Sequence, residues 1–322
     1  MNQTDYAYGV SYIRSIENRL MDKGDIEGLI LTKTPEEAMR MLNDKGYSNE
    51  PVPASEFESL LSKQQSLCWE TVREVAPEGA PLDILLYKND FHNLKVVIKA
   101  VFSGKKEFEH LFLTPATVDT GIIVDAISDK NFEALPEMLK NAAERSYEAL
   151  ANTEDSQLSD IIIDKTSMDY TMACAKMSKS EFIIDLIKLE NTLADIKIAY
   201  RAMKTEKNAD FLNQALSEES GLSREALKDA SLSGEEVLLG YISENGYEEA
   251  ANALKVSVSE FEKYQDKAKN IFVQKANFVT IGAEPLIAYI LKKQAELLSV
   301  RIIMSGKING FSESVIRERL RD

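Results

Sequence analysis

Apolar residues recur every three or four positions through most of the chain, which is the spacing of one face of an α-helix. Three long stretches show it most clearly, and each stripe must pack against neighbouring helices. Their apolar positions are Ile84, Tyr87, Phe91, Leu94, Ile98 and Val101, then Phe182, Leu186, Leu189, Leu193, Ile196, Tyr200 and Met203, and finally Leu286, Ile290, Leu297, Val300 and Met304. Alternating runs of strand length are almost absent, so the pattern predicts an all-α protein.

Residues typical of helix ends stand at the borders of such stretches. Thr34 precedes Pro35 and Glu37, which predicts a capped helix start. Further starts are predicted at Ser55, Ser233 and Ser257, each with Glu three residues later, and at Thr114-Pro115 and Leu135-Pro136. Stops are predicted at Gly46, Gly104, Gly246 and Gly306. The polar stretches 152–159, 205–210 and 217–223 are predicted to connect helices.

The three long stretches form an internal repeat. A shift of 102 residues carries Leu94 onto Ile196, and a shift of 104 carries Ile196 onto Val300. Ser-Gly-Lys follows the first and third stretches, and 35–47 resembles 234–247 with an offset that differs by one residue. Unrelated amphipathic helices also share such an apolar stripe, here called the seam, with Leu94, Ile196 and Val300 as its matched residues. They would not share these additional sequence matches. A period of about 105 residues exceeds that of solenoids, so the chain is predicted to form three helical lobes, 1–112, 113–215 and 216–322.

A basic residue follows the seam residue in every repeat, at Lys95, Lys197 and Arg301. Two interpretations stay open for these three positions. They form ion pairs between helices within each lobe, or they line a surface that meets a partner. They are the candidate functional residues of the chain.

Composition narrows the class of protein further. The 322 residues include 14 Gly and 8 Pro, which favours long elements over sandwiches or doubly wound nucleotide folds. A net charge of −15 argues against duplex nucleic acid as a partner. Two cysteines make no disulfide framework and fit a reducing compartment. The sequence shows no secretory signal at its start and no apolar run of about 18 residues that would span a membrane.

Charge is unevenly distributed along the chain. Residues 206–262 hold 13 acidic and 4 basic side chains, whereas 292–322 hold 7 basic and 4 acidic ones. Both blocks are interpreted either as solvated helix faces or as docking faces for partners of opposite charge.

Groups that carry catalysis are scarce. The two histidines, His92 and His110, have no cysteine or second histidine beside them that would suggest a metal site. The Gly-Lys pairs at 104–105 and 306–307 fail the phosphate-loop pattern and fit helix C-termini instead. No dinucleotide fingerprint occurs, so the sequence predicts no enzyme and no cofactor, metal or nucleotide site.

Both ends of the chain and one inner segment resemble a known family. The segments that carry the resemblance are Asp5-Tyr6-Ala7-Tyr8-Gly9-Val10 with Ile13-Arg14, then Asp90-Phe91-His92-Asn93-Leu94-Lys95, and the ending from Gly282-Ala283-Glu284-Pro285-Leu286 through Ser305-Gly306-Lys307 to Ile316-Arg317-Glu318-Arg319-Leu320. They resemble the C subunit of V/A-type ATPases and ATP synthases, whose eukaryotic counterpart is the V-ATPase d subunit. The resemblance extends over the whole chain and is strongest at its ends.

The resemblance implies a funnel of three similar helical lobes in a pseudo-threefold arrangement. It implies a non-catalytic, cytoplasmic and peripheral membrane component of the central stalk. Such a component joins the shaft, made by the D and F subunits, to the membrane rotor ring, and couples ATP synthesis or hydrolysis to ion transport. A free-standing helical scaffold or regulatory module of the same fold is the alternative. The choice between protons and sodium ions is left open, because ion ligands reside in the ring.

Overall fold

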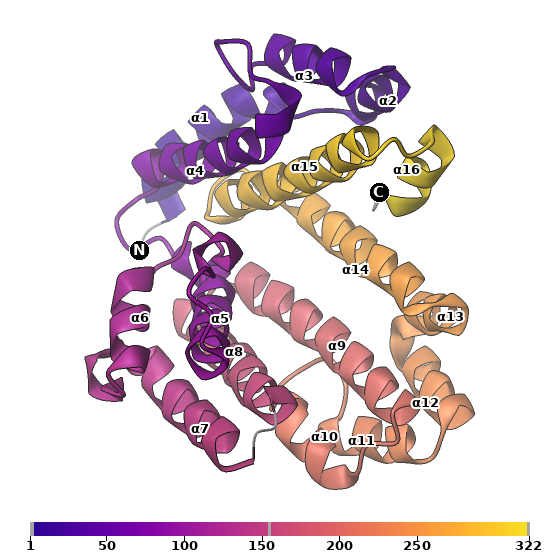
Figure 1. Ribbon diagram of the computed structural model, residues 1–322. Helices are drawn as coiled ribbons and strands as arrows, with labels where there is room; N and C mark the ends of the chain where they lie inside the picture. Colours follow the sequence, from indigo (N-terminus) through magenta and orange to yellow (C-terminus); the bar gives the residue numbers. More distant parts are fainter. Residues whose placement is uncertain (1–2, 154–155, 321–322) are drawn as a thin grey trace. The chain divides into compact units, whose positions relative to one another are not determined.

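The computed structural model describes residues 3–153 and 156–320, and within them the chain is helical without a β-strand (Figure 1). The all-α prediction is confirmed. The helices are α1 (Ala7–Ile16), α2 (Lys23–Leu31), α3 (Pro35–Asp44), α4 (Phe57–Val75), α5 (Tyr87–Ser103), α6 (Thr120–Ser128), α7 (Glu137–Thr153), α8 (Ser156–Ser178), α9 (Glu181–Lys204), α10 (Ala209–Ala215), α11 (Arg224–Leu232), α12 (Glu235–Ile242), α13 (Glu248–Val256), α14 (Val258–Val273), α15 (Glu284–Ile308) and α16 (Glu313–Arg319). Short 3-10 turns and one π-turn, Ser243–Tyr247, connect some of them.

The chain divides into two compact units. Unit 1 consists of Met1–Ala80 and Glu262–Asp322, and unit 2 consists of Pro81–Phe261. Both ends of the chain therefore belong to unit 1, and one of the two boundaries falls inside α14.

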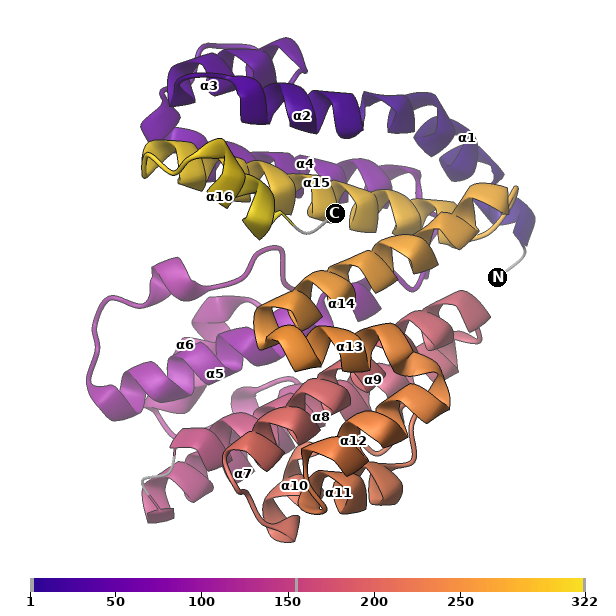
Figure 2. The same cartoon turned by 90° about the vertical axis from the view of Figure 1, so that its right-hand side faces the viewer.

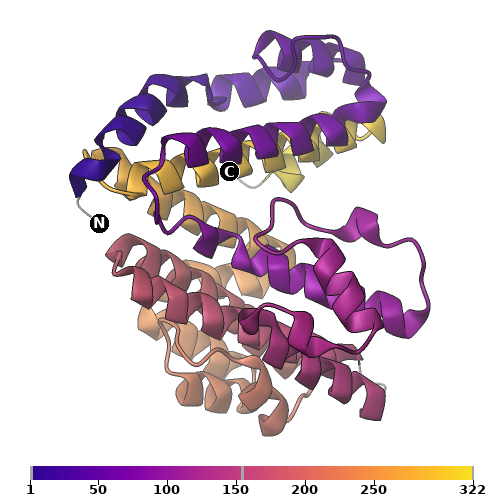
Figure 3. The same ribbon diagram turned by 90° about the vertical axis from the view of Figure 1, so that its left-hand side faces the viewer.

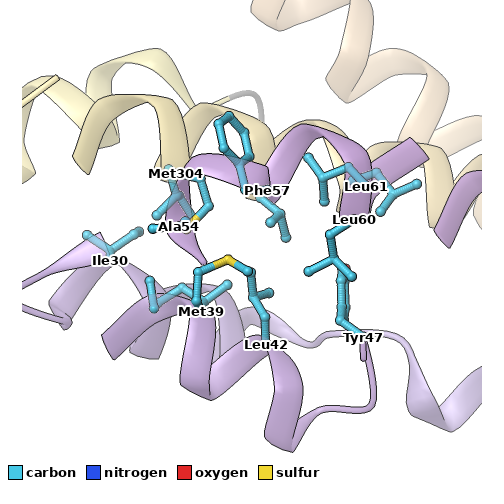
Figure 4. Packing of buried hydrophobic residues seen from close by; sticks show 14 of the residues in the cluster. Ile30, Met39, Leu42, Tyr47, Ala54, Phe57, Leu60, Leu61 and Met304 are labelled. Atoms are coloured by element: carbon cyan, nitrogen blue, oxygen red, sulfur yellow. The ribbon is translucent and has the colours of Figure 1, made fainter. Parts of the chain in front are cut away.

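Unit 1 is built around α15, which contacts α1, α2, α3, α4 and α16. Its core lies where these helices meet. Figure 4 shows side chains of α2, α3, α4 and α15 in one cluster, with Met39 and Leu42 of α3 facing Leu60 of α4 and Met304 of α15. All four side chains are buried.

Unit 2 is built around α7, α8 and α9. The paired helices α7 and α8 lie side by side, and α9 follows α8 (Figures 2 and 3). α5 packs on α6, α7 and α8, whereas α9 carries α10, α11 and α12. The core around α5 includes Phe91, Leu94 and Ile98, which belong to the predicted seam.

The predicted seam residues Leu94, Ile196 and Val300 are all fully buried. Leu94 lies on α5, Ile196 on α9 and Val300 on α15, so the seam is core in each long helix. This part of the sequence prediction is confirmed.

Several predicted helix starts are confirmed. Thr34 caps α3 by accepting the amide of Glu37 at 3.2 Å, and Ser257 caps α14 by accepting the amide of Glu260 at 3.0 Å. Pro136 immediately precedes α7.

Three predicted starts are wrong, each for a local reason. Ser55 lies in a 3-10 turn, and α4 begins only at Phe57 without a side-chain cap. Ser233 donates back to the carbonyl of Asp229 at 2.7 Å, so it is not the cap of α12. No helix begins at Thr114-Pro115, because the next helix, α6, starts at Thr120.

Three predicted stops are confirmed and one is wrong. Gly46, Gly104 and Gly246 adopt positive φ at or after helix ends. Gly306 lies inside α15, which continues to Ile308. The glycine is needed there because α16 packs closely against this position. A Cβ at Gly306 would lie 2.6 Å from the Cγ1 of Ile316. Gly310, with φ 69°, follows the true end.

The predicted connections are confirmed in part. Residues 217–223 join α10 to α11, and 205–208 join α9 to α10. The described residues of 152–159 belong to α7 and α8, whereas residues 154 and 155 lie outside the described part, as do 321 and 322 at the end of the basic block.

Candidate functional site

Each long helix carries a buried polar side chain four residues before its seam residue. These acceptor residues are Asp90, Thr192 and Glu296. Each accepts a backbone amide from the segment that leads into a nine-residue helix, namely α6, α11 or α2. These part-buried amides precede the helices and have partners in the long helices, so the contacts fix where the short helices begin.

Asp90 binds its segment most extensively. Its carboxylate accepts the amides of Thr117 and Val118 at 2.8 and 2.9 Å and the Thr117 hydroxyl at 2.7 Å. Burial raises the pKa of Asp90, and these hydrogen bonds oppose that rise because they favour the charged carboxylate. Asn93, one turn on, adds two bonds to the backbone of Leu113.

The corresponding position on α9 is a neutral hydroxyl. Thr192 Oγ1 accepts the amide of Gly221 at 2.6 Å. A second acceptor, Asp195, accepts both the amide and the hydroxyl of Ser217, at 2.9 and 2.7 Å. Burial raises the pKa of Asp195 to about 6, although the bonds from Ser217 act in the opposite direction.

The acceptor on α15 is part of a charged cluster. Glu296 Oε2 accepts the amide of Met21 at 2.7 Å, while Oε1 accepts the Tyr47 hydroxyl and the Lys293 ammonium, the latter at 2.6 Å. Lys293 also lies 4.4 Å from the Tyr47 ring centroid. Burial, with Glu296 nearby, raises the pKa of Tyr47. The cluster joins residues that are 275 positions apart in sequence.

The three short helices share one pattern of caps and burial. Each has nine residues and begins after a capping side chain, Asp22, Asp119 or Ser223. The seventh and eighth residues after the cap are buried in all three, and they are Leu29 and Ile30, Ala126 and Ile127, and Ala230 and Ser231. The repeat therefore extends from the long helices into the helices that they hold.

Two of the three predicted basic positions have defined partners. Lys95 forms an ion pair with Asp164 of α8, and Arg301 binds Glu58 of α4 at 3.0 Å. Lys197 is half-buried and also interacts within the protein. Lys95 and Lys197 belong to unit 2, whereas Arg301 belongs to unit 1. Their predicted role at a partner surface stays a prediction.

The second Gly-Lys pair has a function that the sequence did not indicate. Lys307 Nζ donates to the carbonyls of Ile30 and Thr32 at 2.9 and 2.5 Å. Those carbonyls close α2, so the ammonium complements the C-terminus of a different helix from its own. Burial lowers the pKa of Lys307.

Each unit contains a sizeable hollow. A groove of about 1140 Å³ in unit 1 is lined by Met21, Asp25, Glu296 and Arg317 among others. A smaller pocket of about 450 Å³ in unit 2 is lined by Asp160, Asp164, Arg201 and Phe211 among others. Among the described residues, the lining of either hollow contains no histidine or cysteine.

The structure places His92 and tests the described residues for metal sites and membrane spans. His92 Nε2 lies 3.1 Å from the carbonyl of Leu111, a contact within the fold. Among the described residues, no group of three His, Cys, Asp or Glu side chains is placed to hold a metal ion. Along the same residues, no helix combines the length and apolarity needed to cross a membrane.

The acceptor residues were missed by sequence reasoning. The three acceptor positions hold different residue types, Asp, Thr and Glu. Their partners are backbone amides of distant segments, so no side-chain motif marks these positions. Asp90 does lie in one of the segments that resemble a known family. Their spacing of four residues from the seam is the one feature that could have revealed them.

Comparison with known proteins gives a consistent result. A family model described as ATP synthase (C/AC39) subunit matches residues 10–319. The chain is 23% identical over 315 residues to the C subunit of the V-type sodium ATPase of Enterococcus hirae, with 96% of both chains covered. It is 25% identical over an alignment of 352 residues to the C subunit of the A-type ATP synthase of Methanocaldococcus jannaschii, with 98% of this chain and 86% of that one covered.

Proposed function

Because the chain belongs to the family of ATP synthase (C/AC39) subunits, we propose that it is the central-stalk C subunit of a V/A-type rotary ATPase or ATP synthase. It is a non-catalytic socket between the central shaft, made by the D and F subunits, and the membrane rotor ring. It transmits the torque that couples ATP synthesis or hydrolysis to proton or sodium transport. The observation that carries the proposal is the family match over nearly the whole chain.

We further propose that the chain forms three lobes, 1–112, 113–215 and 216–322, in a pseudo-threefold funnel. The repeated acceptor residues support this, because each holds the segment before the next nine-residue helix. The third contact is made by α15 to Met21, near the start of the chain. A repeat that binds its last member to its first is what a closed cycle of three lobes requires.

The proposed setting is the cytoplasmic side of the membrane, with peripheral attachment through the ring. Lys95, Lys197 and Arg301 remain proposed partner-facing or inter-helix positions. Long-range torque transmission favours a rigid body, and buried, fully bonded polar contacts such as those of Asp90 supply rigidity.

Reconstitution tests the proposed role directly. The purified chain is expected to bind both the D–F shaft and the detergent-solubilised ring. A complex assembled without it is expected to hydrolyse ATP in its catalytic head without transporting ions, and adding the chain back is expected to restore transport. A chain that binds neither shaft nor ring would support the free-standing scaffold instead.

A further inference from the structure

The α11–α12 hairpin of unit 2 has an outward face with an unusual composition. Its two helices run antiparallel, since the Tyr241 hydroxyl near the end of α12 accepts the amide of Ser223 at the start of α11, at 3.2 Å. The inward residues Leu238, Leu239 and Ile242 are buried. The outward side of α12 instead presents Val237, which is 51% exposed and follows the exposed Glu236.

The charge of this hairpin and the turn that follows it is almost entirely negative. Residues 225–249 contain seven acidic side chains and one basic side chain, Lys228, which pairs with Glu225. Glu235 pairs with Lys204 of α9. Within the described part of the chain, Glu236 and Glu244 have no ion-pair partner. Their charges are therefore available to a cation brought by another molecule.

Gly240 lies between these two carboxylates, four residues from each. Glu236 and Gly240 share one side of α12, and Glu244 follows in the π-turn after it. Glycine inside a helix lowers stability relative to alanine. At several other glycines a Cβ would meet a neighbour, as Gly306 does with Ile316. At Gly240 a Cβ would meet no atom within 4 Å. Packing inside this protein therefore does not explain the missing side chain.

The corresponding helix of unit 1 provides an internal comparison. Gly46-Tyr47 after α3 matches Gly246-Tyr247 after α12, which aligns Arg40 with Gly240 and Glu37 with Val237. Arg40 is exposed on α3, with its Nε 3.4 Å from the carbonyl of Glu36. That face has the charged side chains of an ordinary solvated helix. The missing side chain at Gly240 on α12 is thus not a requirement of the shared fold.

We propose that the notch formed by Glu236, Val237 and Gly240 on α12, with Glu244 in the π-turn that follows it, receives a basic amphipathic helix of a protein partner. The missing Cβ at Gly240 allows close approach of the partner's helix, and Val237 supplies an apolar contact beside it. Glu236 and Glu244, about 12 Å apart along the axis, pair with Lys or Arg of the partner. The inference rests on the proposed function, in which the partner is another rotor component.

The negative charge of the hairpin selects against other occupants. Nucleic acid and anionic membrane surfaces would be repelled by a face with this excess of carboxylates. A basic helix would be attracted, and its association rate would fall as salt screens the attraction.

Substituting Gly240 by alanine separates a binding role from a structural one. Because space is open at this position, Gly240→Ala is expected to leave the melting temperature unchanged or slightly raised. Its affinity for the D–F shaft or for the ring, measured separately, is expected to fall about tenfold, because the added methyl group keeps the partner's helix away. Arg40→Ala on α3 is the matched control and is expected to bind as the wild type does.

The double substitution Glu236→Lys with Glu244→Lys tests the electrostatic part. Its association rate with the same partner is expected to drop and to lose most of its dependence on salt between about 50 and 500 mM. If the wild type binds the shaft or the ring and both Gly240→Ala and the double variant bind it equally well, the proposed notch is wrong while the proposed function stands. Binding of the wild type to anionic vesicles through this face would also overturn it. Failure of the wild type to bind either the shaft or the ring would remove the proposed function itself.

Discussion

The acceptor residues of the two units perform the same task with different chemistry. On α15 of unit 1, Glu296 accepts the amide of Met21 and the hydroxyl of Tyr47. On α9 of unit 2, Thr192 accepts the amide of Gly221. Tyr247 is also close, because a Cβ at Gly221 would lie 2.7 Å from its hydroxyl and 2.9 Å from Thr192 Oγ1. In both units a tyrosine therefore lies close to this contact, bonded to Glu296 in one and beside Gly221 in the other.

The difference lies in the charge. Glu296 brings a negative charge into the interior, and Lys293 neutralises it at 2.6 Å, with both side chains nearly inaccessible to solvent. Thr192 needs no such counterion. The fold therefore requires an oxygen that accepts a backbone amide, not a particular residue type. At Glu296 the charged acceptor brings a second buried group, Lys293, whose stability depends on it.

The largest expected effect comes from separating the charges in unit 1. Glu296→Gln keeps an oxygen for Met21 but leaves Lys293 buried without a counterion, so it is expected to lower the unfolding free energy by about 3–5 kcal/mol. Thr192→Val in unit 2 removes a neutral acceptor and is expected to cost about 1–3 kcal/mol. Urea denaturation of both variants measures the difference.

The double variant Lys293→Met with Glu296→Gln is the control for the charge itself. Removing both charges is expected to recover much of the stability lost in Glu296→Gln, because no uncompensated ion remains. If the double variant were no more stable than the single one, the difference between the units would not arise from charge.

The next effect tests the seam of unit 2 on its two helices α5 and α9. Leu94→Ala and Ile196→Ala are expected to lower the unfolding free energy by about 2–5 kcal/mol each, since both side chains are fully buried. Exposed Leu67→Ala on α4 is a control with an expected change below about 0.5 kcal/mol. Losses below about 1 kcal/mol at both positions would show that the seam is not part of the core of unit 2.

A third, pH-dependent effect belongs to unit 2. The folded-state pKa of Asp195, about 6, lies above its unfolded value, so between about pH 4 and 6 the folded protein binds more protons than the unfolded one. Stability contributed by this group is therefore full below about pH 4 and is lost as pH rises to about 6, by up to about 3 kcal/mol. In Asp195→Asn that portion of the pH dependence should vanish, which denaturation at a series of pH values measures.

Rising stability of the wild type relative to Asp195→Asn across about pH 4–6 would contradict the assignment. Ser217→Ala is a useful companion, because it removes the hydroxyl that favours the charged carboxylate and should move the transition to higher pH.

The helices and the seam could be predicted from the sequence because they depend on local spacing. Thr34, Gly46 and Leu94 behave as predicted, since a cap, a left-handed stop and a buried stripe follow from nearby residues. Gly306 does not, because its reason is the approach of α16. Glu296 and Thr192 could not be predicted either, because their function is set by amides that tertiary packing brings to them.

The candidate basic residues were predicted only in part from the sequence. The sequence suggested ion pairs inside each lobe or a partner surface for Lys95 and Arg301. The structure supplies ion partners on other helices, Asp164 and Glu58, and these come from neighbouring lobes by the predicted boundaries. A partner-facing role is decided by the surface of another molecule, which no pattern in one chain contains.

The smallest expected effect concerns these two exposed pairs, Lys95–Asp164 in unit 2 and Arg301–Glu58 in unit 1. Their carboxylate side chains are each more than half exposed, so water and salt screen the attraction. Lys95→Ala and Arg301→Ala are therefore expected to change the unfolding free energy by less than about 1 kcal/mol, in either unit and less still at high salt. A double-mutant cycle with Asp164→Ala or Glu58→Ala isolates each pair. Coupling above about 2 kcal/mol would show that a pair stabilises the fold as Glu296 and Lys293 do. If coupling is small but either variant binds the D–F shaft or the ring more weakly, the basic side chain acts at a partner surface.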